Sequence, residues 1–332
     1  MLARALANEK RHMSDLPKSI LITEEGPREG FQVEQAPIAT ARKVELIDAL
    51  SQTGLKRIQV VSFVDPKRVP GMADAEQVVA GIRVKPGVEY TGLWLNQKGL
   101  ERARATGKLT LEGKISLYPS EKFLMRNNNR TLEQQTEYVH RVLDSYQEHG
   151  IPVERGSISN AFGCNFQGDI PLAKVVAMVG EIYDIAARHG LHIRELSLAD
   201  TMAWATPLQV KRTVGAIREQ YPDVRINLHL HDTRGMGIAN AYAGLEMGVD
   251  MFDSSVAGLG GCPFAGHKGA SGNVCTEDLV FMCEEIGVRT GVDLDVLIEA
   301  ARLAENIVGH PLPGSVMKGG SLAKLRQSAL VS

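Results

Sequence analysis

The feature that most constrains the fold of this chain is a repeated alternation of short apolar, β-branched runs with segments of helical periodicity. Eight such runs occur, at 19–24, 57–63, 89–95, 114–118, 154–160, 195–200, 225–232 and 250–257. Segments with apolar residues three and four apart lie between them, at 41–53, 132–149, 172–189, 208–220 and 237–247. This alternation predicts a parallel sheet with helices outside it. Eight units predict a (β/α)8 TIM barrel of the α/β class. No glycine-rich nucleotide fingerprint follows the first run, which argues against a doubly wound open sheet.

The organisation of the chain predicts one domain. Its 332 residues contain no low-complexity linker and no sharp shift in composition. We expect a single barrel domain over 19–332, with a helical extension from about residue 277. Residues 1–18 lack the apolar core of a secretory signal, and we expect them to be flexible; a short organelle-targeting segment is the alternative.

The charge balance and cysteine content exclude several classes of partner. The chain has 37 Lys+Arg against 39 Asp+Glu, and 5% aromatic residues. Nucleic-acid-binding domains carry a basic excess and stacking aromatics, so we expect no nucleic-acid partner. No apolar run approaches the ~20 residues of a membrane span, so we expect no membrane contact. Four cysteines without a C-x-x-C pair argue against structural zinc and favour a reducing, cytoplasmic compartment.

Two histidines at the end of the seventh run are the strongest sign of chemistry. His229 and His231 are two residues apart, so in a strand both imidazoles point to the same face. The ends of barrel strands form the catalytic mouth of such folds. Two adjacent imidazoles there are costly to bury unless they bind a metal or have hydrogen-bond partners. Together with oxygen ligands they suit a six-coordinate divalent cation; a pair of structural histidines is the alternative.

Other strand ends also carry polar residues. Arg28 and Glu29 lie between glycines after the first run, where a solvated loop is the alternative. Asp200 follows the sixth run and is equally consistent with capping the next helix. Gln59, within the second run, needs hydrogen-bond partners if it is buried. These positions predict a polar site at the barrel mouth.

A glycine-rich stretch follows the eighth run, over 254–264 and 269–273. Glycine permits positive φ angles and a close approach of the backbone to a ligand. Cys262 lies in this stretch, and a thiol on such a loop is suited to proton transfer under a lid. A small residue in a tight turn is the alternative interpretation of Cys262.

Six segments taken together resemble the 3-hydroxy-3-methylglutaryl-CoA (HMG-CoA) lyase family of metal-dependent TIM barrels. They are EGPREGFQ (25–32), SFVDPKRVPGMAD (62–74), LADT (198–201), HLHDT (229–233), DSSVAGLGGCPFA (253–265) and GASGNVCTEDLV (269–280). The glycine-rich cysteine loop is the most diagnostic of them. The resemblance implies a carbon–carbon lyase that cleaves HMG-CoA to acetyl-CoA and a keto acid. A related 3-hydroxyacyl-CoA such as citramalyl-CoA is the alternative substrate.

The resemblance also implies a set of site residues. A divalent cation, Mg²⁺ or Mn²⁺, would be held by Glu29, His229, His231 and Asn273. Arg28 would stabilise the enolate oxygen, Cys262 would take part in proton transfer, and Asp200 would be a further functional acid. We assign Gln32, Gln59 and Thr233 to substrate binding. The family further suggests a homodimer or homotetramer.

This sequence departs from the family pattern at two positions. The family usually has Asp where this chain has Glu29, so the longer side chain requires a shifted metal or a water-mediated contact. It usually has Glu where this chain has Gln59, which removes a negative charge near the metal. The residues at 266–268 also make the cysteine loop longer. These differences predict an altered substrate or activity on the same fold; a non-catalytic metal- or CoA-binding barrel is the alternative from another class.

Overall fold

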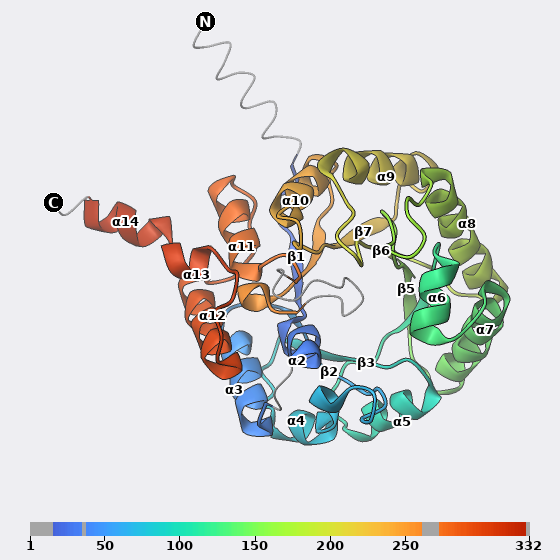
Figure 1. The fold of residues 1–332 in the computed structure, drawn as a ribbon, viewed down its shortest axis with the longest axis horizontal. Helices are drawn as coiled ribbons and strands as arrows, with labels where there is room; N and C mark the ends of the chain where they lie inside the picture. The colour runs from blue at the N-terminus through green and yellow to red at the C-terminus, as the bar shows by residue number, and fades with distance from the viewer. Residues whose placement is uncertain (1–15, 35–37, 261–271, 330–332) are drawn as a thin grey trace, which may run out of the picture.

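The computed structural model describes residues 16–34, 38–260 and 272–329. Within these residues eight parallel strands form one curled sheet surrounded by helices (Figure 1). The strands are β1 (Leu21–Glu24), β2 (Arg57–Ser62), β3 (Glu89–Leu93), β4 (Gly113–Leu117), β5 (Val153–Ile158), β6 (Glu195–Ala199), β7 (Arg225–His229) and β8 (Met251–Ser254). Their hydrogen-bonded order is β3-β2-β1-β8-β7-β6-β5-β4. The predicted (β/α)8 barrel is confirmed, and each apolar run falls on one strand.

The helices lie outside the sheet, as the periodicity predicts. They are α2 (Phe31–Val33), α3 (Thr40–Ser51), α4 (Ala75–Gly81), α5 (Gln97–Ala105), α6 (Glu121–Asn128), α7 (Leu132–Glu148), α8 (Leu172–Arg188), α9 (Pro207–Gln220), α10 (Gly237–Glu246), α11 (Thr276–Glu285), α12 (Leu294–Val308), α13 (Val316–Gly319) and α14 (Leu322–Ala329). The last four form the expected helical extension, and α14 points away from the barrel (Figure 1). A single domain over 19–332 stays a prediction. The segment expected to be flexible falls largely on residues 1–15, outside the described residues. No helix in the described ranges is long and apolar enough to cross a membrane.

The hydrophobic core lies between the sheet and the helices, whereas the interior of the barrel is polar. Ile58 and Val60 on β2 and Leu46 on α3 are fully buried in that core. Because side chains alternate along a strand, the intervening residues face inward. The inward residues that line cavities are mostly polar: Thr23, Glu25, Arg57, Gln59, Lys114, Ser116, Arg155, Ser157, Ser197, Asn227, His229 and Asp253. Barrel interiors are usually filled by branched apolar side chains, so this polar lining marks the interior as part of a site.

The sheet differs from a fully closed barrel between β3 and β4. Among the described residues these strands share no paired register. A hydrogen bond from the Thr110 N–H to the Tyr90 carbonyl (2.8 Å) joins β3 to the segment that precedes β4. An aromatic pair spans the gap, because Trp94 Nε1–H donates to the Tyr146 hydroxyl at 2.8 Å. Gly113 makes room for Tyr146, since a Cβ there would lie 2.5 Å from its ring. Trp94 and Tyr146 also line the cavity.

Two buried carboxyl groups tie the end of β1 to the segment after β8. Glu24 accepts hydrogen bonds from the backbone of Gly26 (2.7 Å) and Val256 (2.9 Å) and from the Thr276 hydroxyl (2.6 Å). Glu277 accepts one from the Ala257 N–H (2.9 Å). Burial raises the pKa of both Glu24 and Glu277 to about 7. Both groups therefore hold a proton in the folded state at pH values where the unfolded chain releases it.

We expect the Glu277→Gln substitution to reduce the pH dependence of the free energy of unfolding. The folded-state pKa of about 7 lies above the ordinary value of 4.5, so the stabilising effect of protonation is complete below pH 4.5 and is lost as the pH rises through 7. Glutamine has no proton to lose. Relative to the wild type, the free energy of unfolding of the variant should therefore be higher by about 3 kcal/mol at pH 8 than at pH 4. Urea unfolding at the two pH values measures this. The exposed Glu148→Gln serves as the control, and an unchanged pH dependence in Glu277→Gln would contradict the prediction.

Candidate metal and catalytic site

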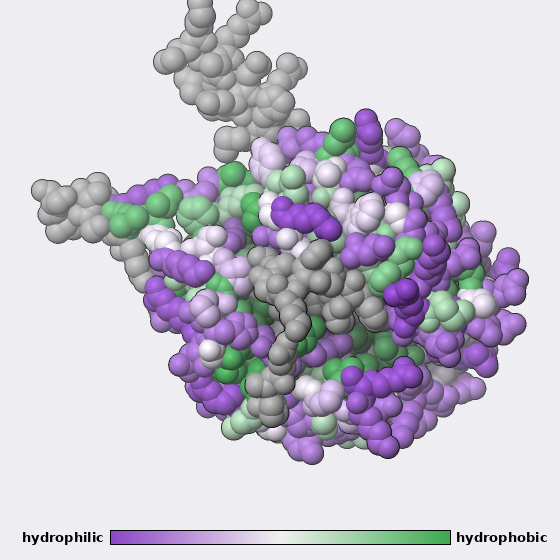
Figure 2. Space-filling view, in the orientation of Figure 1, coloured by the Kyte–Doolittle hydropathy of each residue, from purple (hydrophilic) through white to green (hydrophobic). Residues whose placement is uncertain are grey.

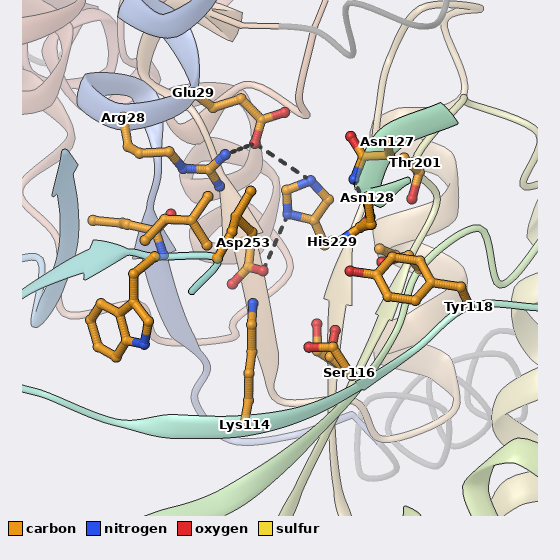
Figure 3. Close-up of a pocket in the computed structure, with 18 of the residues that line it drawn as sticks. Arg28, Glu29, Lys114, Ser116, Tyr118, Asn127, Asn128, Thr201, His229 and Asp253 are labelled. Carbon is orange, nitrogen blue, oxygen red and sulfur yellow. Dashed lines mark hydrogen bonds and ion pairs between the residues drawn. The ribbon is translucent and has the colours of Figure 1, made fainter. Parts of the chain in front are cut away.

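A π-helical turn, η1 (Gly26–Gly30), presents Arg28 and Glu29 to the barrel mouth directly after β1. The Glu29 N–H donates to the Glu25 carbonyl at 2.7 Å, which holds the turn closed. Only glycine fits at position 26, since a Cβ there would lie 2.6 Å from Glu24 Oε1. Figure 3 shows Arg28 and Glu29 side by side above His229 and Asp253.

The two histidines predicted from the sequence direct their Nε2 atoms at Glu29. His231 is bonded through Nδ1 to the Asp200 carbonyl (2.9 Å), so Nδ1 carries the hydrogen, and its Nε2 lies 3.2 Å from Glu29 Oε1. His229 Nδ1 lies 3.2 Å from the Asp253 carboxylate, and its Nε2 lies 3.8 Å from Glu29 Oε2. Holding one ring nitrogen by an acceptor is how proteins orient the other toward a metal.

Asn273 adds an amide beside this cluster. An antiparallel bridge joins its backbone to that of His231, so the two side chains belong to adjoining segments. Gly260 lies against both groups, because a Cβ there would come 3.2 Å from Glu29 Cγ and 3.1 Å from Asn273 Nδ2. Asn273 is 2% exposed, and neither polar atom of its amide has a partner among the described residues.

These residues fit a divalent cation. The donor atoms of Glu29, His229 and His231 lie within 4.8 Å of one another. The Asn273 amide supplies a buried oxygen that lacks a hydrogen-bond partner within the described ranges. Oxygen ligands combined with imidazole nitrogens suit Mg²⁺ or Mn²⁺, whereas soft metals prefer thiolates.

Opposite charges dominate the electrostatics of the site. Although burial opposes ionisation, Arg28 and the bonded His231 hold the pKa of Glu29 well below its usual range. Burial also opposes the charged form of His229, yet its hydrogen bond to the Asp253 carboxylate and the charge of Glu29 raise its pKa to about 9. Arg28 pairs with Glu25 and, at 3.0 Å, with Glu29. The Arg28 guanidinium is thereby fixed in orientation over the cavity.

The other predicted residues divide into those that line the cavity and those that do not. Arg28, Gln32 and Gln59 line it, and the Ser62 hydroxyl donates to Gln32 Oε1 at 3.2 Å. Gln59 Oε1 is buried without a hydrogen-bond partner among the described residues, which leaves this acceptor available to a ligand. Thr233 is half-buried and is absent from the lining. Cys262 lies outside the described residues.

Asp200 contacts the site through its backbone carbonyl. Its Oδ1 accepts hydrogen bonds from the backbone of Trp204 (2.7 Å) and Ala205 (3.0 Å), and its carbonyl holds His231. The carboxylate does not line the cavity, and α9 is capped instead by Thr206. Asp200 thus closes a turn and orients a histidine, while its Oδ2 is buried without a partner among the described residues. The role of Asp200 as a functional acid stays a prediction.

Sequence reasoning passed over three inward-facing charged residues, Glu25, Lys114 and Asp253. All three line the cavity, and Glu25 and Asp253 lie within 3.6 Å and 3.2 Å of His229 Nδ1. The signal was present in the alternation along each strand. Lys114, for example, is two residues from Ser116, and both lie on the inward face of β4.

We expect the Asp253→Ala substitution to weaken binding of Mn²⁺ by about tenfold to a hundredfold, the usual effect of removing a partner that orients a ligating histidine. His229 would lose the acceptor that holds its Nδ1. Isothermal titration calorimetry measures the affinity. Asp250 lies at the N-terminal end of β8, away from the barrel mouth, and pairs with Arg225 at 2.9 Å. Asp250→Ala is therefore the matched control. Equal affinities in both variants would contradict the assigned role of Asp253.

Comparison with known proteins identifies the family. A family model described as HMGL-like matches residues 19–304. The chain belongs to the HMGL-like family. Among its relatives in this family, the human mitochondrial hydroxymethylglutaryl-CoA lyase is 42% identical over 299 residues, which cover 90% of this chain and 89% of the human one. The Bacillus subtilis (strain 168) hydroxymethylglutaryl-CoA lyase is 39% identical over 297 residues, covering 90% of this chain and 96% of the relative. The resemblance inferred from the six sequence segments is thus confirmed.

Solved structures agree with this family assignment. Hydroxymethylglutaryl-CoA lyase from Pseudomonas aeruginosa has a TM-score of 0.83 at 39% identity, covering 92% of this chain and 98% of that one. An HMG-CoA lyase from Acinetobacter baumannii, solved in complex with coenzyme A and 3-methylmalate, has a TM-score of 0.81 at 37% identity, covering 92% and 96%. The carboxyl transferase domain of Rhizobium etli pyruvate carboxylase, at 17% identity and a TM-score of 0.65 over 90% of this chain and 49% of that one, shares the fold alone.

Proposed function

We propose that this protein is a metal-dependent carbon–carbon lyase that cleaves HMG-CoA, or a closely related 3-hydroxyacyl-CoA, to acetyl-CoA and a keto acid. The observation that carries the proposal is the convergence of Glu29 with the Nε2 atoms of His229 and His231 at the rim of a cavity that Arg28 also lines. The relatives named above support the reaction type, and the complex of one of them with coenzyme A supports a thioester substrate.

Glu29, His229, His231 and Asn273 are proposed to hold Mg²⁺ or Mn²⁺. When bound, such a cation supplies Lewis acidity that lowers the pKa of a substrate hydroxyl and orients it. The histidines are held in place by Asp253 and by the Asp200 carbonyl. Since Glu29 is ionised and faces both imidazoles, it provides the anionic member of the set.

The chain's own residues and a water molecule then account for the rest of the reaction. The hydroxyl proton leaves, the C–C bond breaks, and its electron pair moves into the thioester to give the enolate of acetyl-CoA. Because the Asp200 carboxylate does not line the cavity, we favour a water molecule over Asp200 as the proton acceptor. Arg28 stabilises the enolate oxygen through its guanidinium, and Cys262 is proposed to protonate the enolate carbon.

The direct test is release of acetyl-CoA from HMG-CoA by the purified protein with added Mg²⁺ or Mn²⁺. We expect release that depends on the cation and is lost in Cys262→Ala. If the folded, metal-loaded protein releases no acetyl-CoA, HMG-CoA is not its substrate. Citramalyl-CoA, which the departures at Glu29 and Gln59 favour, is then assayed in the same way. Stoichiometric metal binding without turnover of any 3-hydroxyacyl-CoA would instead favour a non-catalytic barrel.

We further propose a cellular location and an oligomeric state. A cytoplasmic location is supported by the bacterial relative and by a mouse relative described as cytoplasmic, 39% identical over 319 residues. A homodimer or homotetramer is proposed from the family resemblance, and α14, which points away from the barrel, is a segment available to contact another copy (Figure 1). Light scattering coupled to size-exclusion chromatography measures the oligomeric state.

A further inference from the structure

The gap between β3 and β4 gives one side of the cavity an apolar lining. The cavity measures about 330 Å³ and extends from Glu29 and His229 to the residues around this gap. The lining from the end of β3, from α6 and from α7 is apolar or aromatic, and we call it the apolar flank. Its members are Leu93, Trp94, Phe123, Val139, Val142 and Tyr146. Figure 2 shows hydrophobic side chains toward the middle of the barrel and hydrophilic ones around its outer edge. Such a lining favours contact with hydrocarbon over contact with polar groups.

A second cavity, of about 260 Å³, continues this lining among the helices outside the sheet. It lies between α5 and α7, where the fully buried Leu100 and the partly buried Ser145 face each other across it. Four residues line both cavities: Trp94, Tyr138, Val142 and Tyr146. Because β3 and β4 share no paired register among the described residues, the partition between the cavities consists of side chains. Side chains can change rotamer to admit a ligand without breaking a ladder of backbone hydrogen bonds.

The polar groups of the partition are already bonded to the protein. The Trp94 indole N–H donates to the Tyr146 hydroxyl at 2.8 Å. The Tyr138 hydroxyl donates to the Leu95 carbonyl. What these rings offer to a ligand is therefore their apolar surface. Among the described residues that line the second cavity, Arg141 alone is charged, and it is exposed to solvent. The interior of this route suits a hydrocarbon chain.

We propose that the apolar flank and the second cavity bind an aliphatic chain on the acyl group, so that the substrate carries a hydrocarbon branch longer than methyl. The inference rests on the proposed function and names its substrate class. With the 3-hydroxyl at Glu29 and the two histidines, the branch lies along the apolar flank, and a long branch passes Trp94 and Val142 into the second cavity. A methyl branch would cover little of this surface, whereas each further methylene group that is buried adds to the affinity.

Straight-chain thioesters that lack a 3-hydroxyl cannot be cleaved, so they test this inference apart from the activity. Decanoyl-CoA differs from butyryl-CoA only in the length of its hydrocarbon chain. Each buried methylene group is worth about a factor of four in affinity, and the cost of ordering the chain reduces the total. We expect calorimetry to show that the wild type binds decanoyl-CoA at least about thirtyfold more tightly than butyryl-CoA.

Substitution of Ser145 tests whether the chain enters the second cavity. Ser145 lines this cavity but not the first, and its hydroxyl has no hydrogen-bond partner among the described residues. Ser145→Phe fills the cavity without breaking a side-chain hydrogen bond, and should lower the preference for decanoyl-CoA by at least about fivefold. Ser145→Leu provides a second variant if the first does not fold. Glu148→Phe, on the exposed face of the same helix, is the matched control and should retain the preference.

The outcomes are distinct. Equal affinities of the wild type for the two thioesters would overturn the assignment of the apolar flank and leave the CoA-ester function intact. A preference that is undiminished in both Ser145 variants, or that falls equally in Glu148→Phe, would also overturn it, because the chain then binds elsewhere. A loss confined to the Ser145 variants supports the assignment even if HMG-CoA is not cleaved. If neither thioester binds, the CoA-ester function fails, and the assignment of the apolar flank fails with it.

Discussion

Arg28→Gln should lower kcat for cleavage of the 3-hydroxyacyl-CoA by about a thousandfold, the upper range for loss of one donor to a developing oxyanion. The guanidinium is half-buried at the rim of the cavity and held by Glu25 and Glu29, so it is oriented before the substrate arrives. The proposed transition state carries more charge on the thioester oxygen than the substrate does. KM should therefore change far less than kcat.

The same substitution removes the positive charge between two carboxylates, so its effect on the metal must be measured separately. Arg28→Lys keeps the charge but loses the two-pronged geometry of the guanidinium, and should retain more activity than Arg28→Gln. Metal affinity, measured by calorimetry, should be similar in Arg28→Lys and the wild type. If Arg28→Gln binds the metal normally and keeps kcat within tenfold of the wild type, Arg28 does not stabilise the enolate.

His231→Gln should abolish metal-dependent activity by weakening binding of Mn²⁺ by at least about a hundredfold. His231 is 3% exposed, its Nδ1 is fixed by the Asp200 carbonyl, and its Nε2 faces Glu29. Removing a residue that only orients a metal-binding histidine usually lowers metal affinity tenfold to a hundredfold. Removing a metal-binding imidazole itself should lower the affinity more.

Thermal unfolding gives an independent measure of the same prediction. A ligand that binds only the folded state raises Tm, so Mn²⁺ should raise the Tm of the wild type and leave that of His231→Gln unchanged. The exposed His192→Gln is the control for replacing a histidine. An equal rise in Tm for the wild type and His231→Gln would show that the metal binds elsewhere.

The sequence alone predicts the elements of the fold because strand and helix periodicities are local. The run at 195–200 corresponds to β6, and the periodic segment at 172–189 to α8. The gap between β3 and β4 could not be foreseen in this way. The rings of Trp94 and Tyr146, which lie at this gap, are 52 residues apart and meet only in the folded chain. Strand periodicity does not report whether two neighbouring strands hydrogen-bond.

The candidate site was predictable where a motif places two groups on one strand, and less so where a role depends on a distant partner. His229 and His231 are such a pair, and the structure brings both to Glu29. Asp200 shows the opposite case, because its contribution through a backbone carbonyl leaves no signature in residue type. Lys114 was overlooked because a single lysine in a strand is ordinarily solvated, and only the barrel topology encloses it.

The groups of the cavity come from two different sectors of the barrel. The proposed metal ligands lie on η1, at and just after the end of β7, and just before α11, whereas Trp94 directly follows β3 and Tyr146 lies on α7. Neither sector supplies residues to the other's task, so selection can remodel the flank without disturbing the reacting centre. An enzyme divided in this way is a favourable starting point for directed evolution. Libraries at Trp94 and Tyr146 should yield variants with new acyl preferences at a constant requirement for metal.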